Sequence, residues 1–426
     1  MLKGKTVIEL TDVKTGQVER YEDENIVTNA LQEYMNALCV MSGINGQLPI
    51  YKNALGGIKL FETALEENVA NVLIPSVGTS KIVGYASYNT KANADARRGN
   101  INLQETSVLD NGVQLVWDFT TSEANGTIGC VCLVPKENSE DSYTPIAGTK
   151  ASLGYSYILY RNVFGIDEEN GLIYCHDGTR ALKCKFPAEN IGLCREGLFQ
   201  PLEVIEVLGE WEFSTGTGTQ KYNSYRLLDA NTAYYIYASG TTLKEYRINL
   251  QTGEKTTSTY TVQNANFAGT YSYRFNGRTV VPQSGYKKMY SVNLEDTSDI
   301  VLIDTPDLVV TSSKYNNYYV FKLQNGDALY GNIVIDPTSG LYCPLFEAPN
   351  YGENPMMSPC VAKYKGFKIL GNLPSPSYSG YSYNGDVYMA ADVERLMTIN
   401  NLQTPVTKTA DKTMKITYTL LESESV

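Results

Sequence analysis

Hydrophobic and polar residues alternate in short segments along most of the chain, which is the pattern of β-strands with one face in water. Residues 6–10 and 17–21 predict a hairpin around a turn at residues 14–16. Residues 412–420 are apolar at every second position and predict a half-buried antiparallel strand. We therefore expect a mainly β protein in which this last strand joins the sheet of the opening hairpin.

Two segments depart from the alternation. Residues 30–38 carry apolar side chains at helical spacing behind the cap residues Thr28 and Asn29. They predict one amphipathic helix of about three turns, with its apolar side on the hairpin sheet. Residues 128–134 are almost continuously apolar, which predicts a buried strand.

Short tyrosine-rich segments recur through the middle of the chain, at intervals of about 40 residues or twice that. They are residues 157–160, 234–237, 271–275, 318–321 and 361–364. A second strand-like motif keeps a similar period, at residues 246–250, 290–294 and 332–336. A period of about 40–45 residues is typical of the four-stranded blades of a β-propeller, which stack around an axis because one blade cannot bury both of its faces.

These patterns predict a propeller-like domain inserted into a β-domain that both chain ends build. Residues 1–148 are assigned to the N-terminal part of an antiparallel β-sandwich-like domain with one helix. Residues 149–370 are assigned to an inserted propeller-like repeat domain of about five or six blades. Residues 371–426 are assigned to a linker and the C-terminal part of the β-domain. Chain ends that lie close together tolerate such insertions.

Charge and hydropathy narrow the classes of partner. The chain has 35 Lys and Arg against 46 Asp and Glu, a net charge of -11. This acidic balance argues against binding to a phosphate backbone, so no nucleic acid partner is expected. No apolar run approaches the roughly 20 residues that span a bilayer, and no apolar signal core follows Met1. We therefore expect synthesis in a cytoplasm and no membrane insertion.

Few residues offer catalytic or metal chemistry. The chain has 1 histidine, His176, which lies in a turn-like Cys-His-Asp-Gly segment and is expected to be structural or solvated. The 8 cysteines include no Cys-x-x-Cys pair, so we expect free and mostly buried thiols. The acidic segment at residues 295–299 is expected to be a solvated turn rather than a calcium site. We predict no catalytic residue, no metal and no cofactor.

Tyrosine provides the candidate binding chemistry, since the chain has 33 Tyr. Most are expected to stiffen the predicted blades. The loop residues Tyr315, Asn316 and Asn317 combine an aromatic ring with amide groups, and we take them as candidate glycan contacts. Glycosidase chemistry needs only two carboxylates, and the sequence neither locates nor excludes such a pair.

Both chain ends resemble a known protein family. The segments that carry the resemblance are residues 2–16, 25–31, 116–128 and 398–415. They are similar to tail and baseplate-associated structural proteins of phages and prophages of Gram-positive bacteria. The resemblance covers roughly residues 1–135 and 385–420 and leaves out the middle. It implies a virion protein whose ends dock and whose middle is exposed.

Taken together, the sequence predicts a non-enzymatic phage virion structural protein of the tail, baseplate or fibre type. Its expected location is the virion. Its expected partners are other virion proteins, further copies of itself in a homo-oligomer, and host cell-surface polysaccharide bound by the propeller-like domain. One alternative is a glycan depolymerase with its site on the propeller face. The other is a purely architectural subunit of the tail, collar or capsid.

Overall fold

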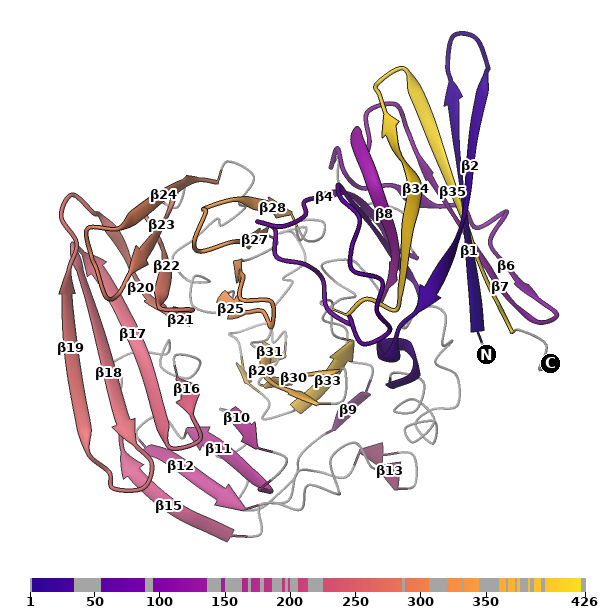
Figure 1. Cartoon of the computed structure of the whole chain (residues 1–426). Coiled ribbons are helices and arrows are strands. Elements are labelled where there is room, and N and C mark those ends of the chain that lie inside the picture. Colours follow the sequence, from indigo (N-terminus) through magenta and orange to yellow (C-terminus); the bar gives the residue numbers. More distant parts are fainter. Residues whose placement is uncertain are drawn as a thin grey trace.

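The computed structural model shows a protein built almost entirely of β-strands (Figure 1). The mainly β fold class is therefore confirmed. Within the described residues a helix is present at residues 29–33, where the predicted helix begins, and its predicted continuation lies outside them. Among the residues that the structure describes, no helix is long and apolar enough to cross a membrane. The structure describes residues 2–33, 55–88, 95–135, 147–149, 163–167, 170–176, 180–185, 194–195, 198–199, 206–213, 225–285, 288–305, 320–330, 333–344, 360–364, 367–371, 374–375, 382–383, 387–391 and 395–422.

The two ends of the chain meet in one antiparallel sheet. β1 (Leu2–Asp12) pairs with β2 (Val18–Val27) on one side and, along its whole length, with β35 (Lys412–Glu422) on the other. β7 (Gly112–Phe119) continues the sheet beyond β35, and β5 (Asn100–Ile101) and β6 (Ser107–Leu109) pair with β7. We call these strands the outer layer. The predicted pairing of the last strand with the opening hairpin is confirmed.

A second layer packs against the outer one. This inner layer consists of β4 (Ile82–Ala86), β3 (Gly57–Phe61), β8 (Gly126–Val134) and β34 (Thr398–Lys408). β2 links the layers at one edge, because Ile26 and Val27 pair with β34. At the opposite edge an isolated bridge joins Tyr85 to Arg98. The two layers are thus two sides of one nearly closed antiparallel sheet, which we call the terminal unit.

Alternation in the outer layer explains the core of the terminal unit. Every second side chain of β1 and β35 is buried, including Ile8 and Ile416. Trp117 of β7 and Tyr418 of β35 are also fully buried. Burial of one such side chain stabilises the fold by about 1.5–3 kcal/mol. β8 differs, since all residues from 128 to 134 are buried, as its continuous apolar run predicts.

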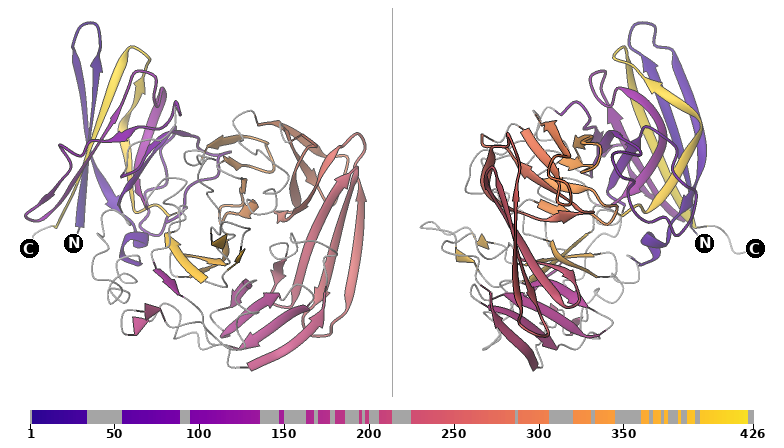
Figure 2. Two further views of the ribbon diagram at one scale, coloured as in Figure 1. Left: turned by 180° about the vertical axis from the view of Figure 1, so that it is seen from behind. Right: turned by 60° about the vertical axis from the view of Figure 1, so that its left-hand side comes forward.

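The middle of the chain forms small antiparallel sheets that follow one another around a common centre in Figures 1 and 2. The first middle sheet contains β10 (Val163–Asp167), β11 (Leu172–His176), β12 (Arg180–Lys185) and β15 (Glu206–Glu212), and the second contains β16 (Arg226–Asp229), β17 (Thr232–Gly240), β18 (Thr242–Asn249) and β19 (Lys255–Thr261), with β20 (Phe267–Ser272) paired to β17. The third contains β21 (Arg274–Phe275), β22 (Arg278–Pro282), β23 (Lys288–Asn293) and β24 (Ile300–Asp304). The fourth contains β25 (Val320–Lys322), β26 (Ala328–Tyr330), β27 (Ile333–Ile335) and β28 (Tyr342–Pro344). Two-stranded sheets are formed by β13 (Cys194–Arg195) with β14 (Leu198–Phe199), and by β31 (Pro374–Ser375) with β32 (Ser382–Tyr383).

The fifth middle sheet combines distant parts of the sequence. β29 (Cys360–Tyr364), β30 (Phe367–Gly371) and β33 (Val387–Ala391) pair in order, and β9 (Ala147–Thr149) pairs with β33 as the fourth strand. This sheet continues beyond residue 370, where the change in composition predicted that a linker begins. The composition changes inside the sheet because residues between β30 and β33 are rich in Pro, Gly and Ser.

The second repeated motif has a structural cause. In the second, third and fourth middle sheets an Asn or Asp follows or ends the third strand, and its side-chain Oδ1 accepts a backbone N–H two residues later. These residues are Asn249, Asn293 and Asp336, which are 44 and 43 residues apart. Asn and Asp favour such turns because their short side chains imitate a backbone carbonyl. The predicted period therefore reflects one turn that is repeated from sheet to sheet.

The tyrosine-rich motif is less regular than predicted. Residues 234–237 lie in β17, the second strand of its sheet, whereas residues 361–364 lie in β29, the first strand. Residues 157–160 lie outside the described part of the chain. Aromatic rings do fill the space between sheets: Tyr235 stacks on Tyr246 with a centroid distance of 4.6 Å, and both belong to the core between the first and second middle sheets.

The inner layer shares a hydrophobic core with the fourth middle sheet. Phe61, Cys130 and Cys132 of the inner layer belong to the same buried cluster as Leu329 and Val334 of the middle sheet. The inner layer therefore has the outer layer on one face and the middle sheets on the other. This double coverage explains why β8 has no polar face.

Hydrogen bonds cross the same boundary. The carboxylate of Asp327, which is 1% exposed, accepts the hydroxyl of Ser76 at 2.7 Å and the backbone N–H of Val77 at 2.9 Å. The side-chain amide of Asn325 donates to the carbonyls of Ile74 and Pro75 at 3.2 and 3.1 Å. Because the carboxylate of Asp327 is buried at this boundary, removing its partners while it stays buried would leave it unsatisfied.

The shared core predicts that the terminal unit and the fourth middle sheet lose structure together. The chain has 2 tryptophans, Trp117 in the terminal unit and Trp211 in the first middle sheet. In a Trp211→Phe background, fluorescence of Trp117 reports on the terminal unit alone. Leu329→Ala, in the middle sheet, should then lower the stability of that unit by about 2–5 kcal/mol, measured by denaturant titration.

The control for this measurement is Leu302→Ala in β24, since Leu302 is 52% exposed and lies outside the shared core. It should leave the transition of Trp117 unchanged. If Leu329→Ala also leaves that transition in place, the shared core does not couple the two parts.

Candidate functional site

The predicted glycan contacts lie on a connection between two middle sheets. Tyr315, Asn316 and Asn317 fall between the end of β24 and the start of β25 in sequence, and they lie outside the described residues. Their role as contacts stays a prediction.

The only histidine of the sequence ends a strand. His176 is the last residue of β11 and lies opposite Ala181 of β12, while its side chain is outside the described part of the structure. The rest of the predicted turn, Asp177 and Gly178, lies outside the described residues. Among the described residues, no group of three or more His, Cys, Asp or Glu is placed to hold a metal ion.

The described cysteine side chains are free thiols in the core. Cys130, Cys132, Cys184 and Cys343 are all buried and unbonded to one another. The sulfur atoms of Cys130 and Cys132 lie 3.5 Å apart on β8. Burial raises the pKa of the Cys132 thiol well above its usual value, which keeps it protonated and unreactive.

A buried ion-pair cluster lies where the second and third middle sheets meet. Glu245 of β18 is fully buried, and its two carboxylate oxygens accept the Nε and Nη2 groups of Arg274 at 2.6 and 2.8 Å. Arg247 donates to the same carboxylate at 2.9 Å, and the hydroxyl of Tyr260 also donates to it, at 3.0 Å. Such two-pronged contacts between a guanidinium and a carboxylate are among the stronger hydrogen bonds in proteins.

Electrostatics keep Glu245 charged despite its position. Burial acts to raise the pKa of this carboxyl, and the hydrogen bonds from Arg274 and then Arg247 outweigh it, so the pKa of Glu245 lies below its usual value. The same contact with Glu245 raises the pKa of Arg274. The pair is therefore ionised at neutral pH.

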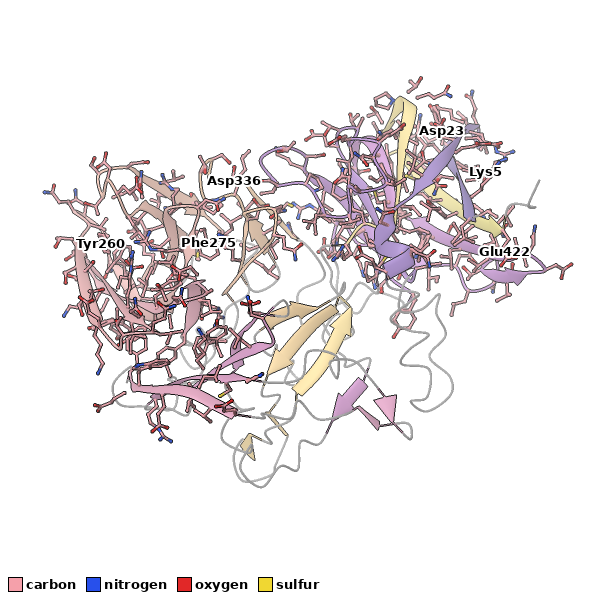
Figure 3. The ribbon with its side chains drawn as sticks, turned by 60° about the horizontal axis from the view of Figure 1, so that its bottom comes forward. Lys5, Asp23, Tyr260, Phe275, Asp336 and Glu422 are labelled. Atoms are coloured by element: carbon pink, nitrogen blue, oxygen red, sulfur yellow. The ribbon has the colours of Figure 1, made fainter. Side chains whose placement is uncertain are left out.

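Aromatic residues surround the cluster. The hydroxyl of Tyr234 accepts the backbone N–H of Arg274 at 3.0 Å, and burial raises the pKa of Tyr234 to about 12. The guanidinium of Arg226 lies 4.1 Å from the ring centroid of Tyr273, which is a cation–π contact. In Figure 3, Tyr260 and Phe275 mark the second and third middle sheets, between which the cluster lies.

This arrangement connects sheets. Because Glu245 is fully buried and both of its oxygens have cationic partners, it is not available as an acid or base for a bound sugar. In some proteins a buried ion pair fixes the relative position of the elements that it joins, even where its net contribution to stability is small. We interpret the cluster as a clamp between the second and third middle sheets.

Sequence reasoning did not find this clamp. Glu245 and Arg247 alternate with Tyr246 and Ile248 along β18, so the strand looks like one with a solvated polar face. That polar face instead packs on the next sheet. Arg274 lies in the tyrosine-rich segment at residues 271–275, which is one of the recurring segments of the sequence. The spacing of such segments does not show which residues meet across two sheets.

Comparison with known proteins adds little to this geometry. No protein-family model and no curated protein matches the chain. Among solved structures, the N-terminal domain of Nup159 is similar at 12% identity and a TM-score of 0.21, over 61% of this chain and 66% of that chain. The AfRom2 CNH domain is similar at 13% identity and a TM-score of 0.25, over 67% of this chain and 93% of that one. The chain thus spans just under two thirds of the Nup159 chain, and scores this low support no argument about function.

The clamp predicts a large effect of neutralising Glu245. Glu245→Gln leaves two arginines without their carboxylate, and loss of one partner of a buried pair costs about 3–5 kcal/mol. Denaturant titration should show this loss in free energy of unfolding at pH 7. The control is Glu210→Gln, because Glu210 forms a similar 2.8 Å contact with Arg180 on the surface. It should leave the transition unchanged, and equal effects of the two substitutions would contradict the clamp.

The clamp also predicts a dependence on pH. Since the pKa of Glu245 is lower in the folded state than its usual 4.5, the unfolded state binds the proton first as the pH falls. The stabilisation is complete above pH 4.5 and is lost as the pH falls through the folded pKa. Thermal melts between pH 6 and pH 3 should therefore show a steeper loss for the natural chain than for Glu245→Gln. Parallel curves would contradict this assignment.

Proposed function

We propose that this chain is a phage virion structural protein of the tail, baseplate or fibre type, anchored by its terminal unit. The observation that carries the proposal is where the resembling segments lie. Residues 2–16 and 25–31 contribute to β1 and β2, residues 116–128 to β7 and β8, and residues 398–415 to β34 and β35. Segments far apart in sequence thus fold into one nearly closed sheet. If the resembling proteins attach to the particle through a common unit, the segments that they share are expected to fold together in this way.

We further propose that the five middle sheets are blades of a propeller-like domain. Its support is the repeated four-stranded sheet, the repeated turn after the third strand, and contacts of β10 with both β16 and β29, the first strands of the sheets on either side. Pairing of β9 with β33 would close the circle, because it joins the start of the domain to its end. The domain would then extend from about β9 to β33.

In this proposal the middle domain faces outward and binds host-surface glycan. Its support is the position of the resembling segments in the terminal unit, which leaves the middle sheets on the other side of the inner layer (Figure 2). The candidate contacts Tyr315, Asn316 and Asn317 lie on a connection between two proposed blades. The two alternatives, a glycan depolymerase and a purely architectural subunit, differ from it in measurable ways.

Three measurements on the full-length protein test the proposal. Purified particles should contain the chain, as shown by mass spectrometry, and fluorescently labelled protein should bind intact host cells. Incubation with cell-surface polysaccharide should release no new reducing ends. Release of reducing ends would establish the depolymerase, and incorporation without cell binding would establish the architectural subunit. Absence from particles would refute the virion role.

A loop variant tests the contact site. Tyr315→Ala with Asn316→Ala and Asn317→Ala should weaken cell binding at least about tenfold, because stacking and amide contacts would be lost together. The matched control is Leu302→Ala on the neighbouring strand β24, which should bind as the natural chain does. Equal binding by all three proteins would remove this loop from the proposed site.

A further inference from the structure

One long strand edge of the terminal unit is open. β2 pairs with β1 from Val18 to Asn25, and it pairs with β34 only through Ile26 and Val27. Among the described residues, the other edge of β2 has no strand partner from Val18 to Asn25, but β34 already contacts it at Asp23. The backbone N–H of Gln403 donates to the Asp23 carboxylate at 3.2 Å, and the side-chain amide of Asn400 donates to the Asp23 carbonyl at 3.4 Å. The open stretch of this edge is therefore Val18 to Glu22. Figure 1 shows the hairpin extending beyond the layers, and in Figure 3 Lys5 and Asp23 lie on the side away from the middle sheets.

The hydrogen-bond pattern shows which backbone groups face this edge. The N–H of Asp12 donates to the carbonyl of Gln17 at 2.9 Å, so these two residues form a hydrogen-bonded pair. Such pairs alternate along an antiparallel ladder. The N–H and C=O groups of the even-numbered residues from 18 to 22 therefore point away from β1 along the open stretch. Together they offer a row of donors and acceptors of the kind that an added strand uses.

The charge of the edge defines what it accepts. Between residues 18 and 25 the chain has four acidic residues against one arginine. Lys5 and Lys412 pair with Glu22 and Glu19, respectively, and Arg20 also pairs with Glu22. Asp23 and Glu24 have no ion pair within the described residues, although the carboxylate of Asp23 accepts the backbone N–H of Gln403. Two copies of this edge placed side by side would bring acidic side chains opposite one another, which is destabilising. A basic partner is favoured over a second copy.

We propose that the open edge of β2 is a docking site for an extended lysine- or arginine-rich segment of a neighbouring virion protein. The segment adds to β2 as a further strand, with main-chain hydrogen bonds for affinity and charge for selection. Val18, which is 53% exposed, provides an apolar contact at the tip of the hairpin. The proposal rests on the proposed function, since it names the surface through which the terminal unit attaches.

A pair of synthetic peptides tests the mode of binding. The probe is a capped peptide that alternates Lys and Val over about eight residues, which is longer than the open stretch from Val18 to Glu22. Calorimetry with the full-length protein at low salt should detect binding. The same peptide with N-methyl groups at alternate amides keeps its charge but loses the strand donors, and it should bind at least about tenfold more weakly. Equal binding of both peptides, or binding of neither, would overturn the proposal.

Two variants of one residue locate the site on the protein. Glu22→Pro removes an edge-directed N–H and keeps the hydrogen bonds between β1 and β2, because proline is tolerated on edge strands. Glu22→Thr removes the charge and keeps the N–H. Relative to Glu22→Thr, Glu22→Pro should bind the peptide at least about tenfold more weakly, with unchanged Trp117 fluorescence as the folding control. Equal affinities would overturn the proposal.

Two further outcomes separate the inference from the proposed function. A dimer in sedimentation that Glu22→Pro abolishes would identify a second copy as the occupant and overturn the basic partner. Peptide binding by a protein that is absent from particles would refute the virion role and leave the docking edge standing. Incorporation into particles without peptide binding would refute the docking edge alone.

Discussion

The structure depends on an inner layer that is buried on both of its faces. β8 and β34 pack against the outer layer on one side and share a core with the fourth middle sheet on the other. An apolar strand has no stable exposed alternative, because seven successive buried residues would otherwise face water. The same layer therefore continues the sheet that the two chain ends form and connects that sheet to the middle sheets through a shared core.

Much of this architecture could be predicted from the sequence. Strict alternation in residues 412–420 identified β35, and the continuous apolar run at residues 128–134 identified β8 as buried. The strand motif at residues 246–250, 290–294 and 332–336 indicated the period of the middle sheets, and the structure traces it to the turns that Asn249, Asn293 and Asp336 close. Local chemistry of this kind is visible in a single sequence.

Contacts between sheets could not be predicted in this way. The clamp of Glu245 and Arg274 joins residues 29 apart whose polarity is typical of solvated strands. Pairing of β9 with β33 brings together residues near 148 and 388, and the Pro-, Gly- and Ser-rich residues before β33 suggested a linker instead. Both depend on how the sheets are arranged, which no local pattern encodes. The candidate loop of Tyr315 to Asn317 was chosen from its residue types alone.

The doubly covered inner layer can be tested through its cysteines. Cys130 and Cys132 of β8 and Cys343 of β28 lie in the same buried cluster. Pulsed alkylation of the native protein, read by peptide mass spectrometry and normalised to the unfolded chain, measures how often each thiol is exposed. If the inner layer is shared, the three thiols should be labelled at one slow rate, because a single opening exposes them all. Fast labelling of Cys343 while Cys130 and Cys132 stay protected would contradict the account.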